Sequence, residues 1–126
     1  MQREPIKNYL PDIKRPEVLK AAISTYGKDA QVDMAIEEMS ELTKALLKYR
    51  RSRNTTDVEY GKLRSNIIEE TADVLIMAVQ ILMMYDKDGE CQAEVDYKIN
   101  RLYERMGLAG KVLAETAAQN GLYPAT

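Results

Sequence analysis

Four carboxylates form two matched pairs in the sequence. Glu38 and Glu41 make an E-x-x-E pattern, and Glu70 and Asp73 make an E-x-x-D pattern. Residues three positions apart in an α-helix lie on one face, one turn apart, so each pair would present two carboxylates together. Acids gathered at a low-dielectric site raise one another's pKa unless a cation neutralises them. The two pairs therefore predict a site for a divalent metal ion.

The residues available as ligands narrow the choice of metal. The chain has no histidine and a single cysteine, Cys91, which excludes histidine-based zinc, triad and di-iron sites and any intrachain disulfide. Ligands that are all oxygen favour Mg²⁺, with Mn²⁺ as an alternative. Because Mg²⁺ is usually shared between carboxylates and substrate phosphates, the predicted substrate class is a polyphosphate. A simply solvated helix face is the competing interpretation for either pair alone.

Long helices must position these pairs. All four prolines lie near the ends of the chain, and the interval between them is rich in Leu, Met, Ala, Glu, Lys and Gln, without period-two alternation. These features predict an all-α fold. The expected helices are, in chain order, 16–26, 28–53, a third that begins near 57 or near 66 and continues to about 86, and 90–106, with a short fifth helix left open in the tail.

Apolar stripes accompany both acidic patterns. The predicted stripe of the second helix is Val32, Ala35, Met39, Leu42 and Leu46, and that of the third is Ile67, Thr71, Val74, Ala78, Ile81 and Tyr85. On the third helix, Met77 and Met84 lie on the same side as Glu70 and Asp73, farther along the helix. Gln80 is the only polar residue within 74–84. The carboxylates are therefore expected at the mouth of a buried region. A segment that is apolar nearly all round also predicts oligomerisation.

Length and charge limit the domain organisation and the classes of partner that the protein can have. With 126 residues the chain is expected to form one helical domain over 16–106, with an N-terminal extension over 1–15 and a C-terminal tail over 107–126. A net charge of -2 gives no field that would attract nucleic acid or an anionic membrane. No apolar run approaches the roughly 20 residues of a membrane span, and no signal peptide is evident, so a cytoplasmic protein is predicted.

Two segments together resemble a known family. "AIEEMSEL" (35–42) and "IIEETADVLIM" (67–77) are similar to the E-E-x-x-E … E-x-x-D signature of the MazG-like, all-α nucleoside triphosphate pyrophosphohydrolases. "DYKINRLYERM" (96–106) resembles the last core helix of that family. The resemblance implies a four-helix-type MazG-like bundle that is completed by assembly into a homodimer or homotetramer.

The resemblance also implies roles for individual residues. The implied Mg²⁺ ligands are Glu38, Glu41, Glu70 and Asp73. Glu37 would assist, either at a second metal ion or in orienting water, and Lys98 and Arg101 would face the triphosphate. The implied reaction is hydrolysis of a nucleoside triphosphate, with non-standard and deoxy nucleotides among the candidates, to the monophosphate and pyrophosphate.

Several alternatives remain open. A non-catalytic helical oligomer or adaptor could keep the acidic pairs as a vestige, and a dUTP or phosphoribosyl-ATP pyrophosphatase of the same superfamily would share the signature. Lys98 and Arg101 also have the spacing of an ordinary solvated face, with Glu94 as a surface partner. The basic run over 48–53 either steers an anion or reflects the attraction of basic side chains to a helix C-terminus.

Overall fold

The computed structural model describes residues 10–53 and 55–119. Within these residues every regular element is a helix, which confirms the all-α prediction. The helices are α1 (Pro16–Tyr26), α2 (Lys28–Arg51), α3 (Asp57–Tyr85) and α4 (Glu90–Gln119). The chain divides into two compact units, Arg15–Lys87 and a second that contains α4. None of the described helices combines the length and the apolar character that crossing a bilayer would require.

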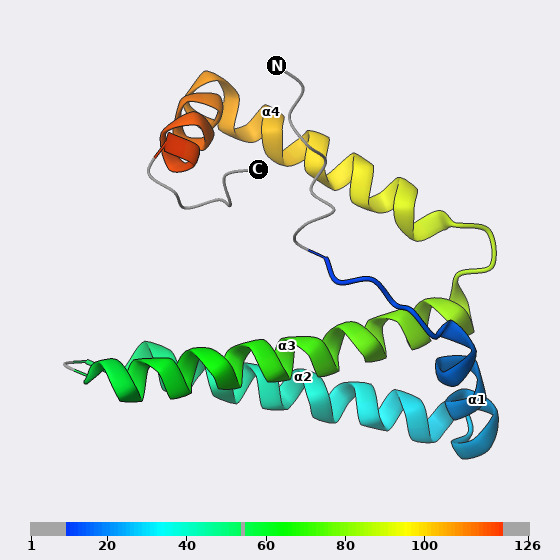
Figure 1. Cartoon of the computed structure of the whole chain (residues 1–126). Helices are drawn as coiled ribbons and strands as arrows, with labels where there is room; N and C mark the ends of the chain where they lie inside the picture. Colours follow the sequence, from blue (N-terminus) through cyan, green and yellow to red (C-terminus); the bar gives the residue numbers. More distant parts are fainter. Residues whose placement is uncertain (1–9, 54, 120–126) are drawn as a thin grey trace. The chain divides into compact units, whose positions relative to one another are not determined.

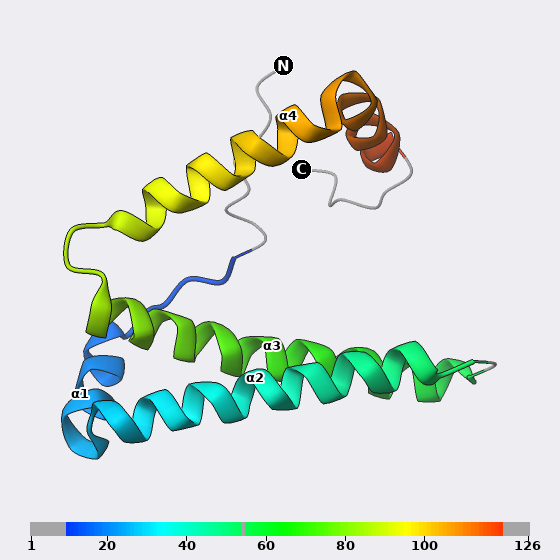
Figure 2. The same ribbon diagram turned by 180° about the vertical axis from the view of Figure 1, so that it is seen from behind.

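The unit Arg15–Lys87 is built on an antiparallel pair of long helices. α2 and α3 lie side by side along their length, and α1 packs against both at the end where α2 begins (Figure 1). The reverse view in Figure 2 shows the same arrangement. We define the α2–α3 seam by its buried residues, which are Gln31, Ala35 and Ala45 of α2 and Met77, Gln80 and Met84 of α3.

Local signals set the helix boundaries. α1 begins at Pro16, as predicted, because the fixed φ of proline suits the first turn and its missing N–H is not needed there. α3 begins after a capping box: the Thr56 hydroxyl accepts a hydrogen bond from the Glu59 N–H at 3.2 Å, and the Glu59 carboxylate accepts one from the Thr56 N–H at 3.1 Å. The predicted start near 57 is confirmed, and the alternative at Asn66, which lies inside α3, is wrong.

A pair of glutamines occupies the α2–α3 seam near the start of α2. Gln31 Nε2 donates a hydrogen bond of 2.6 Å to Gln80 Oε1, and both side chains are buried. Gln80 Nε2 in turn lies 3.6 Å from the Met77 sulfur. Buried amides need partners because an unpaired polar group loses its hydration without compensation. The one polar residue of the apolar segment 74–84 is thus satisfied within the seam.

The predicted apolar stripes form the seam only in part: Ala35 is buried there, but other members of the stripes are exposed. Met39 is 47% exposed, Leu46 is 44% exposed and Tyr85 is 64% exposed. The buried side of α2 is shifted toward Gln31 and Ala45 and keeps only Ala35 of the predicted stripe as a buried residue. Because the distance between packed helices depends on the side chains at their contact, alanines permit a close approach that Met39 and Leu46 would prevent.

α4 consists of two helical segments separated at Gly107. This residue has φ 54° and ψ -145°, a conformation that glycine adopts much more easily than other residues. The first segment therefore ends where the sequence predicted, and the second supplies the short additional helix that was left open. In the first segment Val95, Ile99, Leu102 and Met106 recur at helical spacing and are 42–58% exposed. We call these four residues the α4 apolar face.

Candidate metal centre

Three carboxylates meet across the α2–α3 seam. One oxygen from each of Glu38, Glu70 and Asp73 lies within 4.8 Å of the corresponding oxygens of the other two. α2 supplies the first, and α3 supplies the other two from consecutive turns. All three side chains are half-buried. We call these residues the carboxylate cluster; through them the two acidic patterns of the sequence come together in space.

The local environment favours the protonated form of two of these groups. Partial burial raises the pKa of Glu38 above its ordinary value of 4.5, and the negative charges of Asp73 and Glu70 raise it further. The pKa of Glu70 is also raised, first by partial burial and then by the charges of Asp73 and Glu41. Negative charge is therefore crowded at this point of the seam. A divalent cation would relieve both the burial penalty and the repulsion.

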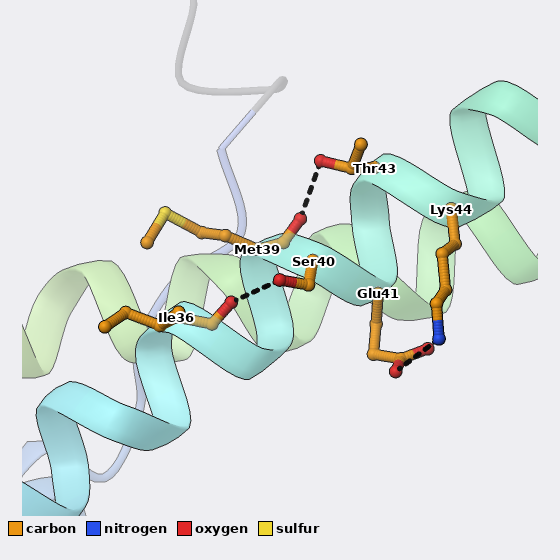
Figure 3. Close-up of polar contacts among 6 residues, drawn as sticks. All are labelled: Ile36, Met39, Ser40, Glu41, Thr43 and Lys44. Atoms are coloured by element: carbon orange, nitrogen blue, oxygen red, sulfur yellow. Dashed lines mark hydrogen bonds and ion pairs between the residues drawn. The ribbon is translucent and has the colours of Figure 1, made fainter.

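Glu41 belongs to the surroundings of the cluster and not to the cluster itself. Its Oε1 atom lies 3.5 Å from Nζ of Lys44, one turn along the same helix, as Figure 3 shows. The charge of Glu41 still contributes to the raised pKa of Glu38 and of Glu70. Glu37 is exposed. Its charge contributes to the raised pKa of Glu38 but not to that of Glu70. Three of the four predicted ligands are thus in the cluster.

The two predicted phosphate-binding residues lie on α4. Lys98 and Arg101 are exposed there, and the Arg101 guanidinium carbon lies 5.6 Å from the centroid of the Tyr97 ring, in a cation–π contact. α4 belongs to the second compact unit, and the carboxylate cluster belongs to Arg15–Lys87. A role for these two side chains at a triphosphate remains a prediction.

A cavity of about 500 Å³ lies along the same two helices, and the sequence analysis missed it. We call it the hairpin-end cavity; it is lined by Lys48, Ser52, Thr55, Glu59, Lys62, Leu63 and Asn66. Asn66 precedes Glu70 by one turn of α3, and Lys48 follows Glu41 by two turns of α2. The cavity therefore extends the seam beyond the carboxylate cluster. The sequence signal that could have indicated this cavity is the recurrence of polar residues at helical spacing on the sides of the two helices that carry the acidic pairs.

The chemistry of the cluster is that of a hard-cation site. Its donors are all carboxylate oxygens, they come from rigid helices, and they are exposed enough for other ligands to approach. Mg²⁺ commonly binds through one or two carboxylates and keeps positions for water and phosphate. No known protein family, curated protein or solved structure matches the chain.

Proposed function

We propose that the chain is a Mg²⁺-dependent hydrolase that converts a nucleoside triphosphate to the monophosphate and pyrophosphate. The observation that carries the proposal is the carboxylate cluster, in which Glu38, Glu70 and Asp73 bring their oxygens within 4.8 Å of one another. Three oxygen donors and no nitrogen or sulfur donor fit Mg²⁺ or Mn²⁺. The resemblance of the two acidic segments to the MazG-like signature supports this reaction.

Each acid would have a distinct part. The carboxylate cluster would hold Mg²⁺, and Glu41 would add negative charge beside it. Bound Mg²⁺ would supply charge neutralisation for the phosphate oxygens and a water of lowered pKa. Glu37, exposed next to Glu38, offers a carboxylate that can orient the attacking water. Hydrolysis between the α and β phosphates requires no covalent nucleophile, which suits a chain without histidine.

A pyrophosphate-release assay tests the proposal. The full chain is incubated with Mg²⁺ and a panel of ribonucleoside and deoxyribonucleoside triphosphates that includes dUTP, with phosphoribosyl-ATP as a further substrate. Pyrophosphate is expected from at least one of them. Asp73→Asn should lower the rate by about a hundredfold or more, because it weakens the binding of the Mg²⁺ that would neutralise the reacting phosphates. Glu69→Gln, an exposed acid on the same helix, is the matched control and should retain the rate.

Two results would contradict the reaction. Release of inorganic phosphate in place of pyrophosphate would exclude cleavage between the α and β phosphates. Absence of pyrophosphate from every substrate, with helical content intact, would favour the alternative of a helical oligomer or adaptor without catalysis. The exposed α4 apolar face supports that alternative, because assembly is the usual way to cover such a surface.

A further inference from the structure

We propose that the hairpin-end cavity binds a phosphoryl group between Lys48 of α2 and Lys62 of α3. Both lysines belong to the lining of the cavity, which has a volume of about 500 Å³. Ser52, Thr55 and Asn66 add hydroxyl and amide groups to the same lining. Two cations and several neutral donors around one cavity match an anion that has several acceptor oxygens.

The positive charge of the cavity is not balanced from within. Glu59 is the one acid in the lining, and its carboxylate already accepts the Thr56 N–H in the capping box at 3.1 Å. Within 10–53 and 55–119, neither Lys48 nor Lys62 forms an ion pair. Their charges are therefore available to an external anion.

The surrounding sequence reinforces this charge. Positions 48–64 contain six basic residues and two acids: Lys48, Arg50, Arg51, Arg53, Lys62 and Arg64 against Asp57 and Glu59. The stretch thus carries a charge of +4 in a chain whose net charge is -2. A local field of this sign raises the concentration of anions near the cavity. The dipole of a helix C-terminus accounts for basic residues at the end of α2, but not for Lys62 and Arg64 near the start of α3.

The cavity and the carboxylate cluster can serve one elongated ligand. Lys62 is about 12 Å along α3 from Glu70, and Lys48 is about 15 Å along α2 from Glu38, at 1.5 Å per residue. A ligand as long as a nucleoside triphosphate, and not a phosphate alone, would be needed to reach both places. The inference does not depend on hydrolysis, since phosphoryl binding at the lysines would persist in a protein without catalytic activity.

Calorimetric titration of the full chain tests the inference. The measurements use metal-free buffer of low ionic strength, with inorganic phosphate, pyrophosphate and a nucleoside triphosphate in separate arms. Wild type is expected to bind at least one of them saturably with one site per chain. Lys48→Gln and Lys62→Gln should each weaken that binding about tenfold, as expected for loss of one charge-assisted hydrogen bond. Circular dichroism checks that both exposed substitutions leave the helices intact.

Lys20→Gln is the matched control, because it removes an exposed lysine of α1 away from the cavity. It should leave the affinity within about twofold, as for a screened surface charge. Lysine-dependent binding of phosphate or pyrophosphate would mean that the phosphoryl group alone is recognised. Lysine-dependent binding of the nucleoside triphosphate alone would mean that the phosphoryl group is recognised as part of a nucleotide. Both results support the inference. No lysine-dependent binding in any arm, or equal weakening by Lys20→Gln, would overturn it.

Failure of this inference is distinguishable from failure of the proposed hydrolysis. Asp73→Asn should lose Mg²⁺-dependent turnover yet retain metal-free anion binding, since Asp73 is not in the lining of the cavity. If Asp73→Asn lost the metal-free binding and the lysine variants kept it, the anion would bind elsewhere and the inference would be wrong.

Discussion

Glu38 and Glu70 bind protons more tightly in the folded chain than in the unfolded chain. Partial burial and the charge of Asp73 raise the pKa of both groups. The same crowding that favours a proton also favours a divalent cation, so protons and metal ions should compete for the carboxylate cluster. Two measurable properties follow, one without metal and one with it.

In metal-free buffer, the free energy of unfolding should fall as the pH rises above 4.5. The folded chain holds more protons than the unfolded chain between 4.5 and the raised pKa values of Glu38 and Glu70. The stability linked to these protons is present below 4.5 and is lost as the pH rises through the raised values. Urea unfolding at a series of pH values measures this. The double variant Glu38→Gln, Glu70→Gln should show a smaller fall, and an identical profile would contradict the prediction.

Mg²⁺ should raise the melting temperature of the wild-type chain at neutral pH. A ligand that binds only the folded state at a hundred times its Kd contributes about 2.7 kcal/mol of stability. Asp73→Asn should lose most of this increase, and should be no less stable than wild type without metal, because it relieves repulsion with Glu38 and Glu70. Thermal unfolding with and without Mg²⁺ provides the measurement. An equal loss in the control variant Glu69→Gln would assign the effect to general surface charge.

At the scale of the helices, features with a local cause were predictable. Pro16 marks the start of α1, and the capping box of Thr56 and Glu59 marks the start of α3, because both signals act through neighbouring backbone groups. α2 ends two residues before the predicted 53, a difference typical of helix termini. The all-α class followed from composition over a long interval without proline.

Features that depend on distant partners were not predictable. Periodicity placed Ala35, Met39 and Leu46 on one packing stripe. The seam keeps Ala35 but buries Gln31 and Ala45 in place of Met39 and Leu46, and only the approach of α3 decides between adjacent sides of α2. Glu41 could not be separated from the cluster by spacing, because its position depends on the rotamers that bring it to Lys44. The hairpin-end cavity likewise requires both helices.

Removal of the cap should destabilise the start of α3. Thr56→Ala deletes the hydroxyl that accepts the Glu59 N–H, and loss of such a cap costs about 1 kcal/mol. Urea unfolding of the chain, followed by its helical signal, should show this decrease in the free energy of unfolding. Thr56→Ser keeps the acceptor and should cost much less. Equal losses in the two variants would mean that the methyl group, and not the cap, is responsible.

At the scale of the whole molecule, apolar surface is exposed on both compact units. Ile36 and Ile68 are 55% and 52% exposed on the α2–α3 pair, and the α4 apolar face is exposed along four helical positions. Separate exposed apolar residues are ordinary, but a periodic face on a long helix is typical of a packing surface. Assembly into the predicted homodimer or homotetramer would cover such a surface.

Light scattering after gel filtration should therefore give a mass above the 14.3 kDa of one chain. The double variant Ile99→Glu, Leu102→Glu places two charges on the α4 apolar face and should shift the mass toward the monomer, because burying unpaired charge is costly. Asn100→Glu, outside the α4 apolar face, should not shift it. A monomeric wild-type chain at micromolar concentration would contradict the assembly.

The buried hydrogen bond between Gln31 and Gln80 has a consequence for alignment. Glu38 lies seven residues after Gln31, and Asp73 lies seven residues before Gln80, so one antiparallel register pairs both sets of residues. If α2 slipped by one turn along α3, the two amides would separate inside an apolar seam and lose their partners. The Gln31–Gln80 hydrogen bond therefore fixes the register of α2 against α3 and, two helical turns away, determines which carboxylates face each other.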